Sequence, residues 1–77
     1  MTHNEIGLML SIEKQTLYGM EIDRIEQKML AVGTESLLYE YLCNERDYFF
    51  DKLAREDRFC KYLVNKINEE HEKGEQQ

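Results

Sequence analysis

The segment 37–53, LLYEYLCNERDYFFDKL, constrains the fold of this chain more than any other stretch. In an α-helix, four of its apolar residues fall on one face at the 3.6-residue period: Leu38, Leu42, Phe49 and Leu53. Further aromatic and aliphatic residues widen this stripe on both sides, so the helix is apolar over far more than a third of its circumference. One other helix from the same short chain cannot cover such a surface. The segment therefore predicts burial by self-association or by binding to another protein.

The composition predicts a small all-α domain. The chain has 77 residues, no proline and four glycines, and it is rich in helix-forming Leu, Glu, Lys, Met and Arg. No stretch alternates apolar and polar residues as a strand would. A single core is marginal at this size without disulfides, metal or oligomerisation. We therefore expect an all-α fold, an antiparallel helical hairpin that pairs with a second copy into a dimeric four-helix bundle.

Helix-end signals divide the chain into two helices. A capping box at Thr2–Glu5 and a second candidate cap at Asn4 both mark the start of the first helix. Gly33 supplies a helix-ending glycine, and Thr34 can cap the helix that follows. The sequence predicts one domain over 1–70, with a helix at about 4–32, a turn at 33–34 and a helix at about 35–70. The polar residues 71–77 are expected to form a disordered tail.

The first helix carries apolar residues on two different faces. One group lies toward the N-terminus: Ile6, Met9, Leu10, Leu17 and Met20. The other follows the 4-3-4-3 spacing of coiled-coil contact positions: Tyr18, Ile22, Ile25, Met29 and Val32. The change of face near Gly19 indicates either a kink or a second partner at the N-terminal end, and we favour the second partner.

The apolar stripe of the second helix continues toward the C-terminus through Cys60, Leu63, Val64 and Ile67, but Glu56 interrupts it. One long helix is our interpretation; the alternative is a break near 55–58, with Asp57 capping a third helix. The longer second helix is expected to overhang the first by about 15 Å at 1.5 Å per residue. That overhang would leave Leu63 uncovered. We predict an oligomer interface made of six apolar residues of this helix: Leu38, Leu42, Phe49, Leu53, Leu63 and Ile67.

No residue pattern in the chain predicts a catalytic, metal or cofactor site. The residues His3, Cys43, Cys60 and His71 lack the close-pair spacing of zinc sites. Cys43 and Cys60 would lie about 25 Å apart on a continuous helix, which is too far for a disulfide, so we expect reduced, buried thiols. We predict that the protein is not an enzyme and binds no cofactor or metal.

One segment resembles a motif of the small bacterial phosphatases that dephosphorylate sporulation response regulators. Those proteins are two-helix hairpins with a Ser-Gln-Glu-Leu-Asp signature on the second helix. Here Cys43-Asn44-Glu45-Arg46-Asp47 follows Gly33 at a comparable distance, and only Glu45 and Asp47 match the signature. The resemblance implies a phosphatase-like activity at these two carboxylates. It is the only enzymatic alternative.

Aromatic residues on one side of the second helix form the candidate partner site: Tyr41, Tyr48, Phe59 and Tyr62. Tyrosine suits interfaces because its ring packs while its hydroxyl stays hydrated. Lys52, Arg55 and Lys66 line the same side, although these rings could instead belong to the self-association core.

The expected function is that of a small acidic regulatory or adaptor protein that binds another protein. The alternative is a phage- or plasmid-type inhibitor of a host enzyme. The net charge of −6 argues against binding to nucleic acid or to anionic membranes. No signal peptide is recognisable, so we expect a cytoplasmic protein of bacterial or phage origin.

Overall fold

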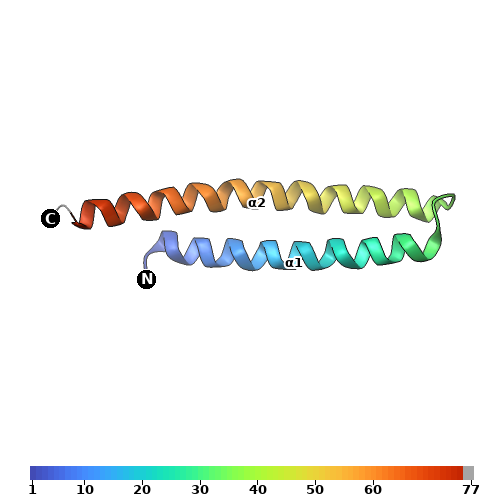
Figure 1. Ribbon diagram of the computed structural model, residues 1–77, viewed down its shortest axis with the longest axis horizontal. Coiled ribbons are helices and arrows are strands. Elements are labelled where there is room, and N and C mark those ends of the chain that lie inside the picture. Colours follow the sequence, from blue (N-terminus) through green and yellow to red (C-terminus); the bar gives the residue numbers. More distant parts are fainter. Residues whose placement is uncertain (76–77) are drawn as a thin grey trace.

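The computed structural model describes residues 1–75 as two antiparallel helices, α1 (His3–Val32) and α2 (Leu37–Glu75), joined by a short turn (Figure 1). The predicted all-α helical hairpin is confirmed. The hairpin is a rod of 63 × 16 × 14 Å, with the start of α1 and the end of α2 toward the same end. Because α2 runs to Glu75, the part of the predicted disordered tail at 71–75 is helical. The rest of that predicted tail, 76–77, lies outside the described residues.

The cap predicted at Thr2 is present, whereas the Glu5 carboxylate bonds the Thr2 hydroxyl and not a backbone amide as in the predicted capping box. The backbone N–H of Glu5 donates to the Thr2 hydroxyl at 3.2 Å, and that hydroxyl donates to the Glu5 carboxylate at 3.2 Å. At the other end of α1, Gly33 has φ 79°, and its N–H donates to the carbonyl of Met29 at 3.3 Å. The helix therefore ends at the glycine that the sequence indicated.

The second helix begins two residues later than expected, because its cap is Ser36 and not Thr34. The Ser36 hydroxyl accepts a hydrogen bond from the backbone N–H of Leu38 at 3.1 Å, and its carbonyl accepts one from Tyr39 at 3.1 Å. Thr34 and Ser36 both carry the hydroxyl that a helix cap needs, so the residue type alone does not show which of them is the cap. The turn thus spans residues 33–36.

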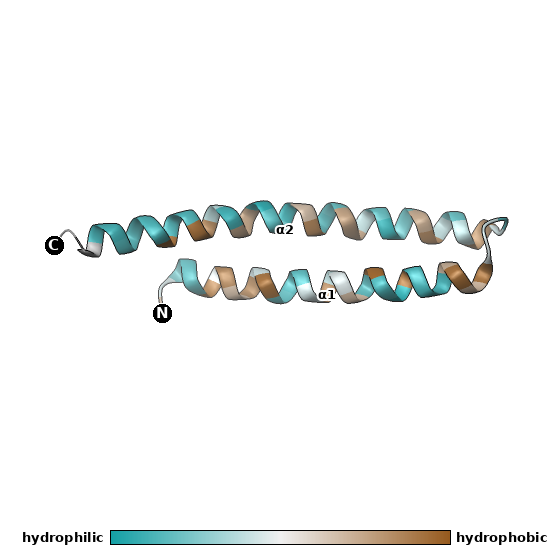
Figure 2. Ribbon diagram, viewed as in Figure 1, coloured by the Kyte–Doolittle hydropathy of each residue, from teal (hydrophilic) through white to brown (hydrophobic). Residues whose placement is uncertain are grey.

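The two helices meet along a coiled-coil seam in which contact positions recur at alternating intervals of three and four residues. The core of the seam lies near the turn, where Ile25 and Met29 of α1 pack with Leu42 of α2. Ile22 and Leu63 are also buried. Hydrophobic segments recur along α1 up to the turn, whereas the C-terminal end of α2 is mostly hydrophilic (Figure 2).

The helix α2 is continuous through residues 55–58, as the interpretation of one long helix predicted, and the alternative break is absent. Glu56 occupies a seam position, where its carboxylate accepts a hydrogen bond from the hydroxyl of Ser11 at 2.7 Å. Lys14 lies 3.7 Å from the same carboxylate. A polar partner on α1 thus accommodates the residue that interrupts the apolar stripe.

The predicted overhang of α2 is present, since α2 has 39 residues and α1 has 30, but Leu63 does not belong to it and is buried against α1. A Cβ placed on Gly7 would lie 3.4 Å from a Leu63 methyl, and the Asn4 amide donates to Glu70 at 2.7 Å. The prediction that Leu63 lies uncovered was wrong, because Leu63 lies in the stretch of α2 that packs against the first turns of α1. The C-terminal end of α2 extends past the N-terminus of α1 (Figure 1).

Candidate protein-binding surface

The aromatic shoulder, which we define as Tyr41, Tyr48, Phe59 and Tyr62, lies on one side of α2. Tyr41, Tyr48 and Tyr62 are spaced by multiples of seven residues, so they form one stripe along the helix. Each of the four side chains is about half exposed, between 48% and 58%. The structure stacks two of them, because the Phe59 and Tyr62 ring centroids lie 6.4 Å apart with planes at 19°. The four predicted site residues are therefore all partly exposed on one side of α2, and two of them are in contact.

Lysine side chains lie over the rings of this shoulder. The Lys66 ammonium lies 5.7 Å from the centroid of the Tyr62 ring, and the Lys52 ammonium lies 4.9 Å from that of Tyr48. Lys52 also lies 5.8 Å from the ring of Tyr18 on α1, which connects the shoulder to the other helix. Such cation–π contacts hold the rings in place and add positive charge to their faces.

The hydroxyl of Tyr41 donates a hydrogen bond to the carboxylate of Glu45 one turn later, at 3.1 Å. This hydrogen bond and the negative charge of Glu45 raise the pKa of the Tyr41 phenol. The phenol therefore stays neutral at physiological pH and keeps its proton for the bond. Glu45 in turn fixes the direction of the ring at one end of the shoulder.

The two carboxylates that resemble the phosphatase signature point to different sides of α2. Glu45 is half-buried and accepts the bond from Tyr41, whereas Asp47 is exposed. Residues two apart on a helix do not face each other. The structure therefore does not bring Glu45 and Asp47 together as a catalytic pair.

Most of the residues predicted as an oligomer interface face α1 of the same chain. Leu42 and Leu63 are buried in the seam, and Phe49, Leu53 and Ile67 are half-buried. Of the six, only Leu38 is half exposed. These residues thus build the hairpin itself, and their contact with a second copy stays a prediction.

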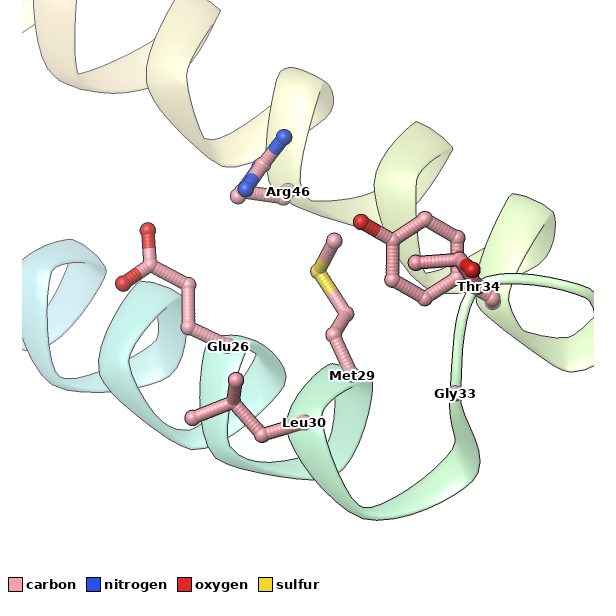
Figure 3. A pocket seen from close by; sticks show the side chains of 7 residues that line it. Glu26, Met29, Leu30, Gly33, Thr34 and Arg46 are labelled. Atoms are coloured by element: carbon pink, nitrogen blue, oxygen red, sulfur yellow. The ribbon is translucent and has the colours of Figure 1, made fainter.

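A hollow of about 430 Å³ lies near the turn, lined by Glu26, Met29, Leu30, Gly33, Thr34, Tyr39 and Arg46. Glu26 of α1 and Arg46 of α2 border the space between the helices, both on the same side of Met29 (Figure 3). The Arg46 guanidinium lies 5.9 Å from the centroid of the Phe50 ring. The hollow brings one acidic and one basic side chain near an apolar floor, and its lining contains no cysteine or histidine.

Sequence reasoning missed the polar seam residue Ser11. It is the most completely buried side chain described, with 2% of its surface exposed. The signal was available, because the coiled-coil spacing extended from Tyr18 toward the N-terminus by seven residues reaches Ser11. Extending the spacing one step further reaches Asn4, which is paired with Glu70.

The remaining features of residues 1–75 add no second chemistry. Cys43 and Cys60 are free, half-buried thiols. No group of three or more metal-binding side chains occurs among the described residues. Neither of the two described helices contains a stretch apolar enough to cross a membrane. Comparisons of the chain with protein-family models, with curated proteins and with solved structures find no match.

Proposed function

We propose that this chain is a small, non-enzymatic regulatory or adaptor protein that acts in the cytoplasm by binding another protein. The observation that supports the proposal is the aromatic shoulder, four half-exposed rings aligned on one side of a rigid helix. The half of each ring that stays in water contributes no burial energy to the hairpin's own fold. Their burial by a partner would supply the missing contact.

The chemistry of the shoulder suits a protein partner. Full burial of one large apolar side chain stabilises a complex by about 1.5–3 kcal/mol. Tyrosine is also enriched among the residues that dominate binding energy at interfaces. Lys52, Arg55 and Lys66 lie on the same side, where Arg55 pairs with Asp51 at 3.1 Å and Lys66 with Glu69 at 3.5 Å. The preferred partner is therefore a protein surface with an apolar groove that accepts the rings.

The test removes two rings and measures partner capture. The double variant Tyr41→Ala with Tyr48→Ala should reduce capture of the wild-type partner from source-cell extract by tenfold or more, because two anchors are lost. Its helicity and oligomeric mass should stay close to those of the wild type. Capture is read by quantitative mass spectrometry.

A matched control comes from the opposite flank of α2. Phe50 and Val64 are exposed to a similar degree, at 45% and 40%, and they lie at seam-flanking positions away from the shoulder. Phe50→Ala with Val64→Ala should leave capture unchanged. Retained capture by the tyrosine variant, or a broken oligomer in that variant, would contradict the proposed site.

A further inference from the structure

The helix α1 carries a second seam on the side that faces away from α2. This outer seam contains Ile6, Leu10, Glu13, Leu17, Met20 and Arg24, again at alternating intervals of four and three residues. All six side chains are exposed in the single chain, including the four apolar ones. Coiled-coil spacing predicts a helix as the structure that covers such a stripe.

The outer seam is most apolar where the inner seam is most polar. Between Asn4 and Gln15, three of the four seam positions of α1 are polar (Asn4, Ser11 and Gln15) and one is the half-buried Leu8, while Ile6 and Leu10 are exposed. Beyond Met20 the pattern reverses, and buried apolar residues face α2. The N-terminal half of α1 is thus better suited to an external helix than to its own hairpin partner.

The accessible surface of the chain also exceeds that of a compact monomer. It measures 6125 Å², whereas a compact 9.3-kDa protein exposes about 5,000 Å². The excess is larger than the roughly 800 Å² that each partner contributes to a standard interface. A second copy of the chain can bury surface of this size.

We propose that the outer seam of α1 binds the same seam of a second copy, antiparallel, across a two-fold axis. The register that places Leu17 of one copy opposite Met20 of the other also places Glu13 opposite Arg24. The two-fold axis repeats both contacts. The same register sets Ile6 opposite Ala31, so the two α1 helices overlap over nearly their whole length.

Other alignments of the two seams are poorer. A parallel pair sets Glu13 against Glu13 and Arg24 against Arg24, which places like charges together. Shifting the antiparallel pair by one heptad sets Glu13 against Leu17 or against Ala31, which leaves the charge without a partner. Charge complementarity therefore selects one register.

The flanks of the outer seam agree with this register. Next to the contact positions, Met9 of one copy comes opposite Leu30 of the other. Leu30 is 86% exposed in the single chain, although its neighbours on the outer face of α1 are polar. The antiparallel pair therefore accounts for an isolated exposed leucine.

This inference deepens the proposed function, because it leaves the aromatic shoulder free. The inner and outer seams lie on opposite sides of α1, so the four helices of the dimer lie side by side in the order α2, α1, α1, α2. Both copies of α2 are outermost. Each dimer then presents two aromatic shoulders to partners.

The test exchanges the charges of the outer seam. Glu13→Arg alone, and Arg24→Glu alone, should each weaken dimerisation by about tenfold or more, since two attractive contacts become repulsive. The double variant Glu13→Arg with Arg24→Glu should dimerise like the wild type. An equimolar mixture of the two single variants should form a 1:1 dimer, because each charge then meets its opposite on the other chain. Sedimentation equilibrium measures all four samples.

The control is Glu40→Arg, which changes the net charge as Glu13→Arg does, but at an exposed position of α2 outside the outer seam. It should leave dimerisation unchanged. A monomeric wild type at 100 µM, or single variants that dimerise like the wild type, would overturn the proposal. So would a double variant or a mixture without restored dimers. Partner capture by the shoulder is measured separately, so failure of either proposal is recognised on its own.

Discussion

At the scale of single residues, the pair Ser11–Glu56 sets the alignment of the hairpin. The Ser11 hydroxyl is almost fully buried and donates to the Glu56 carboxylate at 2.7 Å and to the Glu56 carbonyl at 3.3 Å. A hydrogen bond to a carboxylate is stronger than a neutral one. A slip of the helices would leave both polar groups in the seam without partners, which costs more than the bond is worth.

Ser11→Ala should lower the free energy of unfolding by about 1–2 kcal/mol, because the partly buried carboxylate of Glu56 loses its donor. Urea denaturation followed by circular dichroism measures the change. Thr16→Ala is the control, since the exposed Thr16 hydroxyl donates only to the carbonyl of Ile12 in its own helix. Equal stability of Ser11→Ala and the wild type would show that the pair does not hold the seam.

The same pair shows why the sequence could be only partly interpreted. Glu56 was recognised as an interruption of the apolar stripe, and a helix break was the alternative that followed. Its partner lies 45 residues away in the chain, so no local pattern connects the two. Only the spacing of the α1 seam, extended past its last apolar member, leads to Ser11.

At the scale of elements, the turn was predictable to within two residues. Gly33 ends α1 with a positive φ of 79°, as a glycine between two helical patterns indicates. The start of α2 was less certain, because Thr34 and Ser36 both carry capping hydroxyls.

Two glycine substitutions should act in opposite directions. Gly33→Ala should destabilise the hairpin by about 1 kcal/mol, because a side chain at positive φ is strained. Gly19→Ala should stabilise it by about 0.5–1 kcal/mol, because Gly19 is inside a helix and a Cβ there meets nothing within 4 Å. Thermal unfolding by circular dichroism compares the two. Changes of the same sign would contradict the assigned end of α1.

At the scale of the whole molecule, one face of each helix packs against the other helix, and apolar side chains on the other faces remain exposed. The segment 37–53 predicted that the chain needs more cover than one partner helix, and Tyr41 and Tyr48 on this segment are indeed half exposed. The change of apolar face near Gly19 likewise predicted a second contact for the N-terminal half of α1, where Ile6, Leu10 and Leu17 are exposed. Which neighbour covers which face depends on a second molecule, and a single sequence does not contain that information.

The stability of the protein should therefore depend on its concentration. If dimerisation through α1 stabilises the fold, mass action raises the thermal midpoint as the protein becomes more concentrated. We expect the thermal midpoint to rise by several degrees between about 1 and 100 µM protein. Circular dichroism in cells of matched absorbance measures this rise. At 100 µM, light scattering should give twice the chain mass of 9.3 kDa. Glu13→Arg should have a lower midpoint than the wild type at every concentration, and adding Arg24→Glu should restore it. A cooperative transition with one midpoint across this range would mean that a single hairpin is stable alone.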